Sequence, residues 1–420
     1  MKSIFALLTT LIATSVWADW QQDINDVESD LLEWRRYIHQ NPELSNREFK
    51  TAAYVEQHLR DLGLEVKTGI AFTGVVGILR GDLPGPVLAL RADMDALPVT
   101  EQVDLSFASK VTAEYRGETV GVMHACGHDT HVAMLMAAAS VFAKNKAELK
   151  GTLMFIFQPA EEGAPGDEEG GAELMLAEGL FDDLKPEAVF GIHVTSNANT
   201  GVALYRTGPY MAAVDDFELK IIGQQAHGSR PWSGIDPIVT AAQIINSVQT
   251  IVSRRTDVTK APAVVSFGAI KGGIRNNIIP DDVTMVGTIR NFDMGIRDNI
   301  HQQLENIITH VAAANEAEVE FKINEGYPVT VNDPTLGERM LPSLHKVFGA
   351  NQVVDPGLIT GAEDFSFLAN EVPGLYFFMG VTPKGQDALS APTNHSPLFF
   401  VDETALLYGV KAFVQLVQDY

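Results

Sequence analysis

Cysteine is almost missing from this chain of 420 residues, which holds a single one, Cys126. One cysteine excludes an internal disulfide, so in an exported protein the thiol must be buried, paired between chains or bound to something. Beyond the first residues, no apolar run is long enough to be a membrane span. There is no internal repeat and no low-complexity segment. A hydrophobic content of 46% is typical of an ordinary globular chain rather than a disordered or fibrous one.

Positive charge is also scarce, because 30 Lys and Arg residues face 54 Asp and Glu residues, for a net charge of −24. This balance argues against a nucleic-acid partner, which needs a basic surface, and against docking on an anionic membrane. The length of the chain favours two domains over one core.

The first residues have the features of a signal peptide. Lys2 supplies a short positive region, Ile4–Ala13 is largely apolar, and small residues end the segment at Ala18. The alternative is a buried N-terminal helix. We expect residues 1–18 to be a signal peptide and the chain to be exported, to a periplasm or beyond the cell.

Hydrophobic patterning predicts an α/β fold with two domains. Residues 19–208 and 326–420 alternate strands and helices, which predicts a central mixed β-sheet with helical cover. Residues 209–325 have the order βαββαβ of a ferredoxin-like sandwich, inserted into the first domain. Several polar residues directly follow apolar strands, where open α/β sheets place their sites.

The densest group of chemically active residues is His124–His131, which holds three histidines, Cys126 and Asp129. Cys126 and His128 are two positions apart, so in an extended loop both can point to one side. A helix follows, and its N-terminal field favours a thiolate. A capping loop would explain Asp129 or Thr130 but not the histidines, so we expect this loop to bind metal.

Three further loops carry candidate ligands. Glu161 and Glu162 follow the strand Leu153–Phe157, where one carboxylate can be a ligand and the other a general base. An acidic loop is the alternative for this pair. His193 ends the strand Ala188–Ile192 and His395 precedes the last helix, and either alone is more often structural. Four such loops at one sheet edge could supply the nitrogen, oxygen and sulfur ligands that suit zinc.

These motifs resemble the amidohydrolase branch of the co-catalytic, two-metal zinc peptidases, which includes hippurate hydrolases, N-acyl-amino-acid aminoacylases and auxin-conjugate hydrolases. The segments that carry the resemblance are Met123–His131, Gln158–Glu162, Phe190–His193 and Gly223–Pro231. The resemblance implies a catalytic domain interrupted by a lid domain. It also implies two divalent metal ions, zinc or manganese, with nickel or cobalt as alternatives. The implied ligands are Cys126 as a bridge, His128, Glu162, His193 and His395.

The same resemblance assigns the remaining roles. Glu161 becomes the general base, and His227 in the lid stabilises the oxyanion, in some relatives from a neighbouring subunit. Asn277 and Arg290 become substrate-binding residues, Arg290 as the weaker candidate for a substrate carboxylate. The implied reaction is hydrolysis of an N-acyl-amino acid of the hippurate type, with a homodimer formed through the lid.

Two features depart from the peptidase branch. Asp93-Met-Asp95 replaces a His-x-Asp pair, so we expect Asp93 and Asp95 to support the ligands rather than to be ligands. The loop after Glu162 is longer and more acidic than the short glycine turn that is usual in this family. A dipeptidase or carboxypeptidase of the same family stays an alternative. A non-catalytic metal or ligand carrier is the alternative from another class, although it would have no use for Glu161.

Overall fold

The computed structural model describes residues 13–166 and 168–420. The predicted signal peptide lies largely outside these residues, and its expected cleavage point after Ala18 falls within helix α1 (Ala13–Asp26). In the part of the chain that is described, no helix combines the length and apolarity that a bilayer span requires.

The chain forms two compact units, each with its own hydrophobic core. Unit 1 runs to Thr207 and resumes over Asn332–Pro356 and Leu368–Tyr420, and unit 2 comprises Gly208–Val331 and Gly357–Phe367. Residues 326–331 and 357–367, which the sequence analysis places in the first domain, group with unit 2 in this division. Ile359 explains the second segment, because its backbone bonds to Tyr210 and Ala212 of unit 2.

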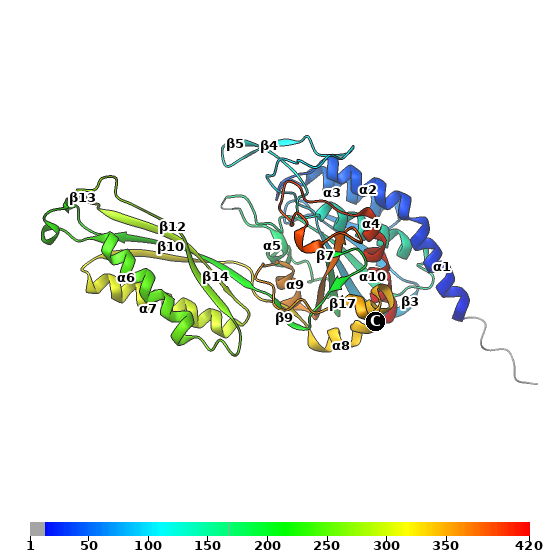
Figure 1. The fold of residues 1–420 in the computed structure, drawn as a ribbon. Helices are drawn as coiled ribbons and strands as arrows, with labels where there is room; N and C mark the ends of the chain where they lie inside the picture. The colour runs from blue at the N-terminus through cyan, green and yellow to red at the C-terminus, as the bar shows by residue number, and fades with distance from the viewer. Residues whose placement is uncertain (1–12, 167) are drawn as a thin grey trace, which may run out of the picture. The chain divides into compact units, whose positions relative to one another are not determined.

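Unit 1 is built on an eight-stranded mixed sheet with the order β1-β2-β6-β3-β7-β18-β8-β17. Figure 1 labels β3, β7 and β17 of this sheet. Strands β6, β3, β7 and β18 run parallel, whereas β1 and β2 are antiparallel additions at one side. The strands are β1 (Glu65–Ile70), β2 (Gly74–Arg80), β3 (Leu83–Asp93), β6 (Lys150–Gln158), β7 (Ala188–Asn199), β8 (Ala203–Leu204), β17 (Val353–Val354) and β18 (Gly374–Thr382). The carboxyl ends of the parallel strands β6, β3, β7 and β18 meet at one edge of the sheet, and the candidate loops follow there.

Helices cover this sheet. The central one, α4 (His128–Lys144), contacts β3 and packs mainly against α2 (Glu28–Gln40) and α10 (Leu406–Asp419), and nearly all of its side chains are buried. It is rich in alanine and methionine, which allows close approach on every side. The other helices are α3 (Phe49–Asp61), α5 (Gly171–Ala177), α8 (Pro334–Phe348) and α9 (Phe365–Glu371).

Unit 2 contains a four-stranded antiparallel sheet of order β12-β14-β10-β15. Its strands are β10 (Ala213–Ile222), β12 (Ala263–Gly272), β14 (Asp282–Asn291) and β15 (Glu318–Glu325), and its helices are α6 (Pro237–Thr250) and α7 (Met294–Ala314). Strand β10 alternates, with Phe217 and Leu219 buried against the helices and Asp216 and Glu218 exposed. The βαββαβ prediction is confirmed, as is the two-part α/β class.

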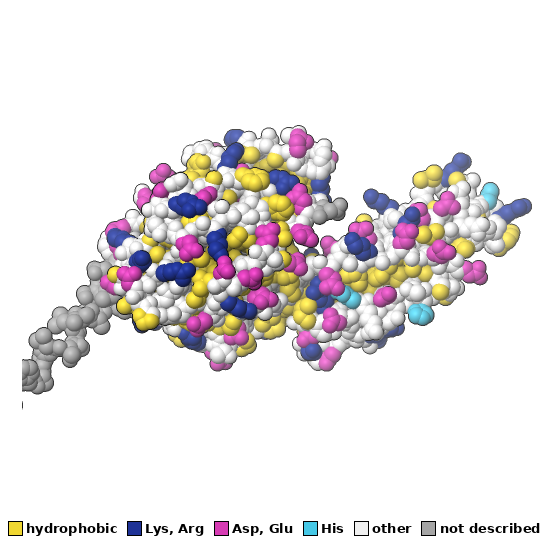
Figure 2. Space-filling view, turned by 180° about the vertical axis from the view of Figure 1, so that it is seen from behind, with side chains coloured by type: hydrophobic (Ala, Val, Ile, Leu, Met, Phe, Trp, Pro, Cys, Tyr) yellow, Lys and Arg dark blue, Asp and Glu magenta, His cyan; other side chains and the backbone are white. Residues whose placement is uncertain are grey.

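Short elements complete both units and were not predicted. They are β4 (Thr112–Tyr115), β5 (Glu118–Gly121), β9 (Gly208–Met211), β11 (Ala226–His227), β13 (Ile278–Ile279) and β16 (Thr330–Asn332). Strands β4 and β5 form a hairpin that is a separate two-stranded sheet. On the surface that Figure 2 shows, acidic and basic side chains are interspersed over both units.

Candidate metal centre

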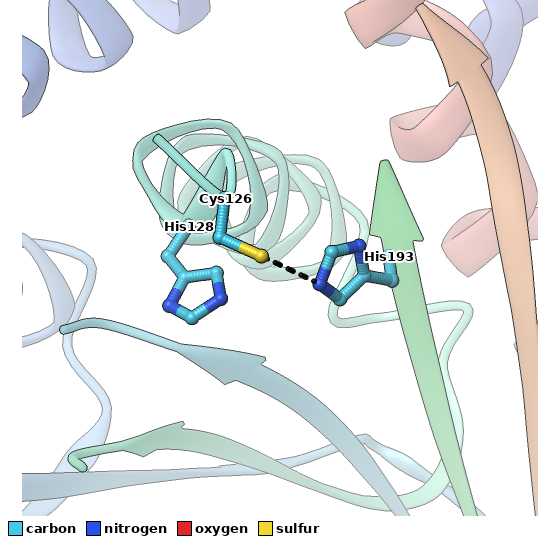
Figure 3. A group of neighbouring side chains, drawn as sticks. All are labelled: Cys126, His128 and His193. Atoms are coloured by element: carbon cyan, nitrogen blue, oxygen red, sulfur yellow. Dashed lines mark hydrogen bonds between the residues drawn. The ribbon is translucent and has the colours of Figure 1, made fainter. Parts of the chain in front are cut away.

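The loop before α4 brings Cys126 and His128 into one cluster with His193 from β7 (Figure 3). Gly127 between them has φ of 95°, and a Cβ there would lie 2.4 Å from Val194 Cγ2. Only glycine tolerates both the left-handed backbone and this close approach. The turn therefore lets two neighbouring side chains face one point.

Cys126 is the centre of this cluster. Its Sγ lies 3.4 Å from His193 Nε2 and 3.2 Å from His395 Nε2. His395 Nε2 is also 3.1 Å from Glu162 Oε1. The thiol is buried, and one cation held between these atoms would contact sulfur, nitrogen and oxygen donors together.

A second group shares His128 and both glutamates. His128 Nε2 lies 3.8 Å from Glu161 Oε2 and 4.0 Å from Glu162 Oε1. All five predicted ligands thus fall in overlapping groups whose donor atoms lie within 4.8 Å of one another, with Glu161 beside them. Cys126 and Glu162 each belong to two of these groups.

The two buried histidines present their Nε2 atoms to the cluster because their Nδ1 atoms are engaged elsewhere. His193 Nδ1 donates to the Val194 carbonyl at 2.7 Å, and His128 Nδ1 donates to Asp95 Oδ1 at 3.2 Å. In the neutral form of each ring, a proton on Nδ1 leaves a lone pair on Nε2. Metal-binding histidines have this arrangement, in which a carbonyl or carboxylate fixes the ring.

The residues fit a pair of cations because the cluster holds polar atoms that the protein does not satisfy. Among the described residues, His128 Nε2 is buried without a hydrogen-bond partner, a costly state unless an ion binds there. Glu162 Oε1 has only the contact with His395 Nε2 at 3.1 Å, which lacks hydrogen-bond geometry. Burial, with Glu162 and Glu161 nearby, raises the pKa of the Cys126 thiol well above its ordinary value. Burial alone would lower the pKa of His128, but Asp93 and Asp95 raise it to about 10. The local field favours a positive charge.

Asp95 organises the loop around it. Its carboxylate accepts hydrogen bonds from the backbone nitrogens of Glu161 and Glu162, at 3.1 and 3.0 Å, and from Ser45 Oγ at 2.7 Å. Together with the bond from His128, it fixes both glutamates and a histidine. Its position after β3 indicated a supporting residue, but these four partners come from three distant segments.

Asp93 and His131 form a second carboxylate–histidine pair, which contacts the backbone of β7. His131 Nδ1 donates to Asp93 Oδ1 at 2.5 Å, and its Nε2 accepts from the Val194 amide at 2.9 Å. Arg91 Nη1 pairs with Asp93 at 2.6 Å. Because both His131 nitrogens are engaged, it positions β7 rather than offering a free donor.

Sequence patterns missed the contribution of Glu48. Its buried carboxylate accepts from the Ala160 amide at 2.9 Å and from Thr73 Oγ1 at 2.7 Å. Ala160 has φ of 51°, so this bond holds a strained turn just before Glu161. Burial and the charge of Asp95 raise the pKa of Glu48 to about 8. No local motif marks a residue that acts through a backbone amide over a hundred positions away.

Unit 2 holds the other predicted site residues. His227 and Asn277 are brought together at the β11–β13 pair, where the Gly228 amide donates to the Asn277 carbonyl at 2.9 Å. Both side chains are exposed, and His227 Nδ1 accepts from Ser229 Oγ at 2.9 Å. Both side chains are available to a ligand, but their functional groups do not form a cluster with each other.

Arg290 lies elsewhere in unit 2. It is half-buried near the end of β14, opposite Val214 of β10 and eight positions beyond Asp282 (290 − 282). That length of strand spans about 27 Å. Burial lowers its pKa, while Asp216 and Asp215 oppose the shift. Asn277 directly precedes β13, and β13 lies just before the Asp282 end of β14. Arg290, near the other end of β14, is therefore far from Asn277 within unit 2.

Nitrogen, oxygen and sulfur donors at the carboxyl edge of a mixed sheet, with the Glu161 carboxylate beside them, are typical of a metal-dependent hydrolase. The comparisons agree: residues 89–419 match the model of peptidase family M20/M25/M40. The chain belongs to this family, in the branch that holds IAA-amino acid hydrolases, N-acetylcysteine deacetylases and carboxypeptidases. It is a hydrolase of amide or peptide bonds.

Several relatives match over nearly the whole chain. Thermostable carboxypeptidase 2 of Saccharolobus solfataricus is 41% identical over 94% of this chain and 96% of its own. N-acetyl-L-cysteine deacetylase of Bacillus subtilis is 37% identical over 92% and 86%. The structure of the YXEP protein of Bacillus subtilis, described as a dinuclear metal binding peptidase from the M20 family, has a TM-score of 0.77 at 34% identity, covering 94% and 98%.

Proposed function

We propose that this protein is an exported amidohydrolase that cleaves the amide bond of N-acyl-amino acids with two divalent metal ions, zinc or manganese. The observation that carries the proposal is the convergence of four further donor residues on Cys126, with the buried Nε2 atom of His128 left without a hydrogen-bond partner. The relationship to a deacetylase of N-acetyl-L-cysteine supports an N-acyl substrate.

Cys126, His128, Glu162, His193 and His395 hold the ions in this proposal. When bound, the ions polarise the amide carbonyl and make water a stronger nucleophile at neutral pH. Glu161 takes the proton of the attacking water and gives it to the leaving amine. Its backbone is fixed by Asp95, so its carboxylate stays beside His128 and Glu162 throughout.

The first test is hydrolysis of N-acetyl- and N-benzoyl-amino acids by the chelated protein and by the protein reloaded with Mn²⁺ or Zn²⁺. Reloading should restore a rate that chelation abolishes, since the five proposed ligands would hold both ions. Activity that ignores chelation would overturn the metal assignment. Hydrolysis of no N-acyl compound and no dipeptide would overturn the enzyme assignment.

A carboxypeptidase or dipeptidase is the second candidate, favoured by two carboxypeptidases of Saccharolobus solfataricus that are 41% identical to this chain. Both reactions cleave an amide beside an amino acid, so the same ligands and base serve either. A dipeptide and its N-acetylated counterpart, each ending in the same amino acid, separate the two. A higher kcat/KM for the free dipeptide would favour the peptidase.

Unit 2 acts in this proposal as a lid that forms a homodimer. His227 and Asn277 lie at the β11–β13 pair, whereas Arg290 lies at the opposite end of β14. One chain therefore cannot place all three on the same small substrate. Arg290 serves the site of its own chain by holding the substrate carboxylate, and His227 stabilises the oxyanion in a second copy.

Mixing two inactive variants tests this exchange. Glu161→Gln and His227→Ala chains, refolded together, should recover about a quarter of the wild-type rate. The reason is that half of the dimers are mixed and each mixed dimer rebuilds one intact site. Glu161→Gln mixed with Glu162→Ala is the control, because both changes fall in the same site. No recovery in the first mixture would place His227 in its own chain or remove it from the reaction.

Export through residues 1–18 is the remaining part of the proposal. The apolar run Ile4–Ala13 and the small residues before Asp19 support it. Cleavage should leave a mature chain beginning at Asp19. N-terminal sequencing of the protein from a periplasmic fraction checks this, and an intact Met1 there would contradict it.

A further inference from the structure

His395 is the most exposed of the five proposed ligands. Its side chain is 54% exposed and that of Glu162 is 13% exposed, whereas Cys126, His128 and His193 are buried. His395 lies in the β18–α10 connection, residues 383–405, and has φ of 72°. This left-handed conformation is strained for a residue other than glycine. Neighbouring contacts must therefore hold the backbone of His395 in place.

The preceding residue, Asn394, makes such contacts through its side-chain amide. Its Nδ2 donates to the carbonyls of Cys126 and Val194, each at 3.0 Å. Its Oδ1 accepts from the Ser196 amide at 3.3 Å. An asparagine amide has two N–H donors and one carbonyl oxygen, so this arrangement uses every one of its polar groups and fixes its orientation.

The bonds of Asn394 fasten the His395 loop to the Cys126 loop. The backbone amide of His395 donates to the Ala125 carbonyl at 2.8 Å, directly before the Cys126 carbonyl that Asn394 binds. Two consecutive residues of one loop are therefore bound to two consecutive carbonyls of the other. Asn394 Nδ2 also lies 4.0 Å from Cys126 Sγ. Together these contacts set the distance between the thiol and the His395 ring.

The Val194 carbonyl connects Asn394 to a third ligand. This oxygen accepts from His193 Nδ1 at 2.7 Å and from Asn394 Nδ2 at 3.0 Å. The same atom therefore orients the His193 ring and anchors Asn394. All of these residues belong to unit 1.

An asparagine that only fastens a loop is the alternative, and the same connection contains one. Asn199, at the end of β7, donates from Nδ2 to the Pro383 carbonyl at 3.0 Å and to the Gln386 carbonyl at 2.9 Å. Neither acceptor belongs to a proposed ligand or binds one. Asn394 differs because one of its acceptors is the carbonyl of Cys126 and the other holds a ligand ring.

We infer that Asn394 is a positioning residue of the metal centre, which sets the geometry of Cys126, His193 and His395 together. The inference rests on the ligand set of the proposed function. Altering a residue that orients metal ligands typically changes metal affinity 10- to 100-fold. The largest effect falls on the ion that His395 helps to hold, because this ligand has the strained backbone and the exposed side chain.

The test is a stepwise titration of the metal-free protein with Co²⁺, in which thiolate-to-cobalt absorption reports the bond to Cys126. Asn394→Leu has about the size of the native side chain without its hydrogen bonds. It should weaken the binding of one equivalent about 10- to 100-fold and reduce the absorption that this equivalent produces. Asn394→Ser keeps one donor and should give a smaller loss. Asn199→Ala is the matched control and should keep both affinities.

Thermal unfolding separates positioning from general support of the connection. Metal that binds the folded chain raises its Tm by an amount that depends on the affinity. Asn394→Leu and Asn199→Ala should lower the Tm of the metal-free protein by similar amounts, since each removes bonds from one connection. Only Asn394→Leu should reduce the rise in Tm that Co²⁺ produces.

The outcomes distinguish this inference from the proposed function. Wild-type protein that binds no Co²⁺ would overturn the proposed function. Two equivalents in the wild type, with unchanged affinities and absorption in Asn394→Leu, would overturn the role of Asn394 alone. An equal loss of affinity in Asn199→Ala would also overturn that role, because any fastening of the connection would then be enough.

Discussion

Both units bury an aspartate next to histidine and arginine side chains, and the two clusters differ in what they leave unpaired. In unit 2, Asp215 is bound by Arg297, by His301 Nε2 at 2.7 Å and by the Gly326 amide at 3.1 Å. Each oxygen of the Asp215 carboxylate therefore accepts at least one hydrogen bond from these groups. In unit 1, the carboxylates of Asp93 and Asp95 engage only one side of their histidines. The Nε2 atom of His128 has no hydrogen-bond partner among the described residues and lies 4.0 Å from Glu162 Oε1.

This difference separates a structural cluster from a binding cluster. Buried charges that satisfy one another hold a fold in place, and removing one leaves its partners uncompensated. Buried donors that converge without satisfying one another need a ligand. The same residue types occur in both clusters, so the pairing of individual atoms, rather than composition, indicates where the chemistry occurs.

The largest expected effect is on Glu161, whose carboxylate lies 3.8 Å from His128 Nε2 beside the proposed ligands. Glu161→Gln should lower kcat about 10³-fold, because general-base assistance is lost, while metal content stays the same. Glu168→Gln, on the same loop, is the control and should keep its rate. Near-normal turnover of Glu161→Gln would remove it as the base.

Asp215→Asn should have the next largest effect, and on stability rather than on metal. Removing one partner of this buried pair leaves Arg297 uncompensated, which costs about 3 kcal/mol. Hydrogen exchange of β10 and α7 amides should accelerate while those of α4 keep their rates. If metal affinity fell with Asp215→Asn, the separation between the two clusters would be wrong.

Asp95→Asn should weaken metal binding about 10- to 100-fold, because a residue that orients a metal-binding histidine is altered. Competition with a coloured chelator measures the affinity, and Asp215→Asn provides the comparison from the other cluster. Unchanged affinity would mean that His128 does not depend on its bond to Asp95.

Lowering the pH should reduce the stability of unit 2 over the range in which Asp215 is protonated. Burial alone would raise the pKa of Asp215, but the bonds from His301 and Arg297 lower it to about 2. The stability from this depressed pKa is complete above the unfolded value near 3.9 and is lost as pH falls through about 2. Wild type and Asp215→Asn should therefore converge in β10 amide exchange between pH 4 and pH 2. A constant gap over this range would contradict the role of Asp215.

The sequence was sufficient for features whose signals are local. The βαββαβ order followed from alternating patterns such as that of β10. The ligand candidates could be named because Cys126 and His128 lie within one loop and the glutamates follow an apolar strand. Strand ends converge at one sheet edge, so their order along the chain was enough to expect a cluster.

Features that depend on distant contacts escaped prediction. Glu48 acts through the Ala160 amide, and no local pattern marks it. The segment 357–367 belongs to unit 2 because the backbone of Ile359 forms hydrogen bonds with Tyr210 and Ala212. The β4–β5 hairpin is short and its Arg116-Gly117 turn lacks the asparagine or aspartate that usually marks one. The separation of Arg290 from Asn277 required the strand register.

Metal stoichiometry tests the central assignment most directly. The protein is stripped with a chelator, reloaded with Mn²⁺ or Zn²⁺, desalted and analysed for bound metal per chain, together with Glu161→Gln and Cys126→Ser. Two equivalents in the wild type and in Glu161→Gln, with loss in Cys126→Ser, are the predicted result. Fewer than two equivalents in the wild type, or an unchanged content in Cys126→Ser, would contradict a two-metal site centred on Cys126.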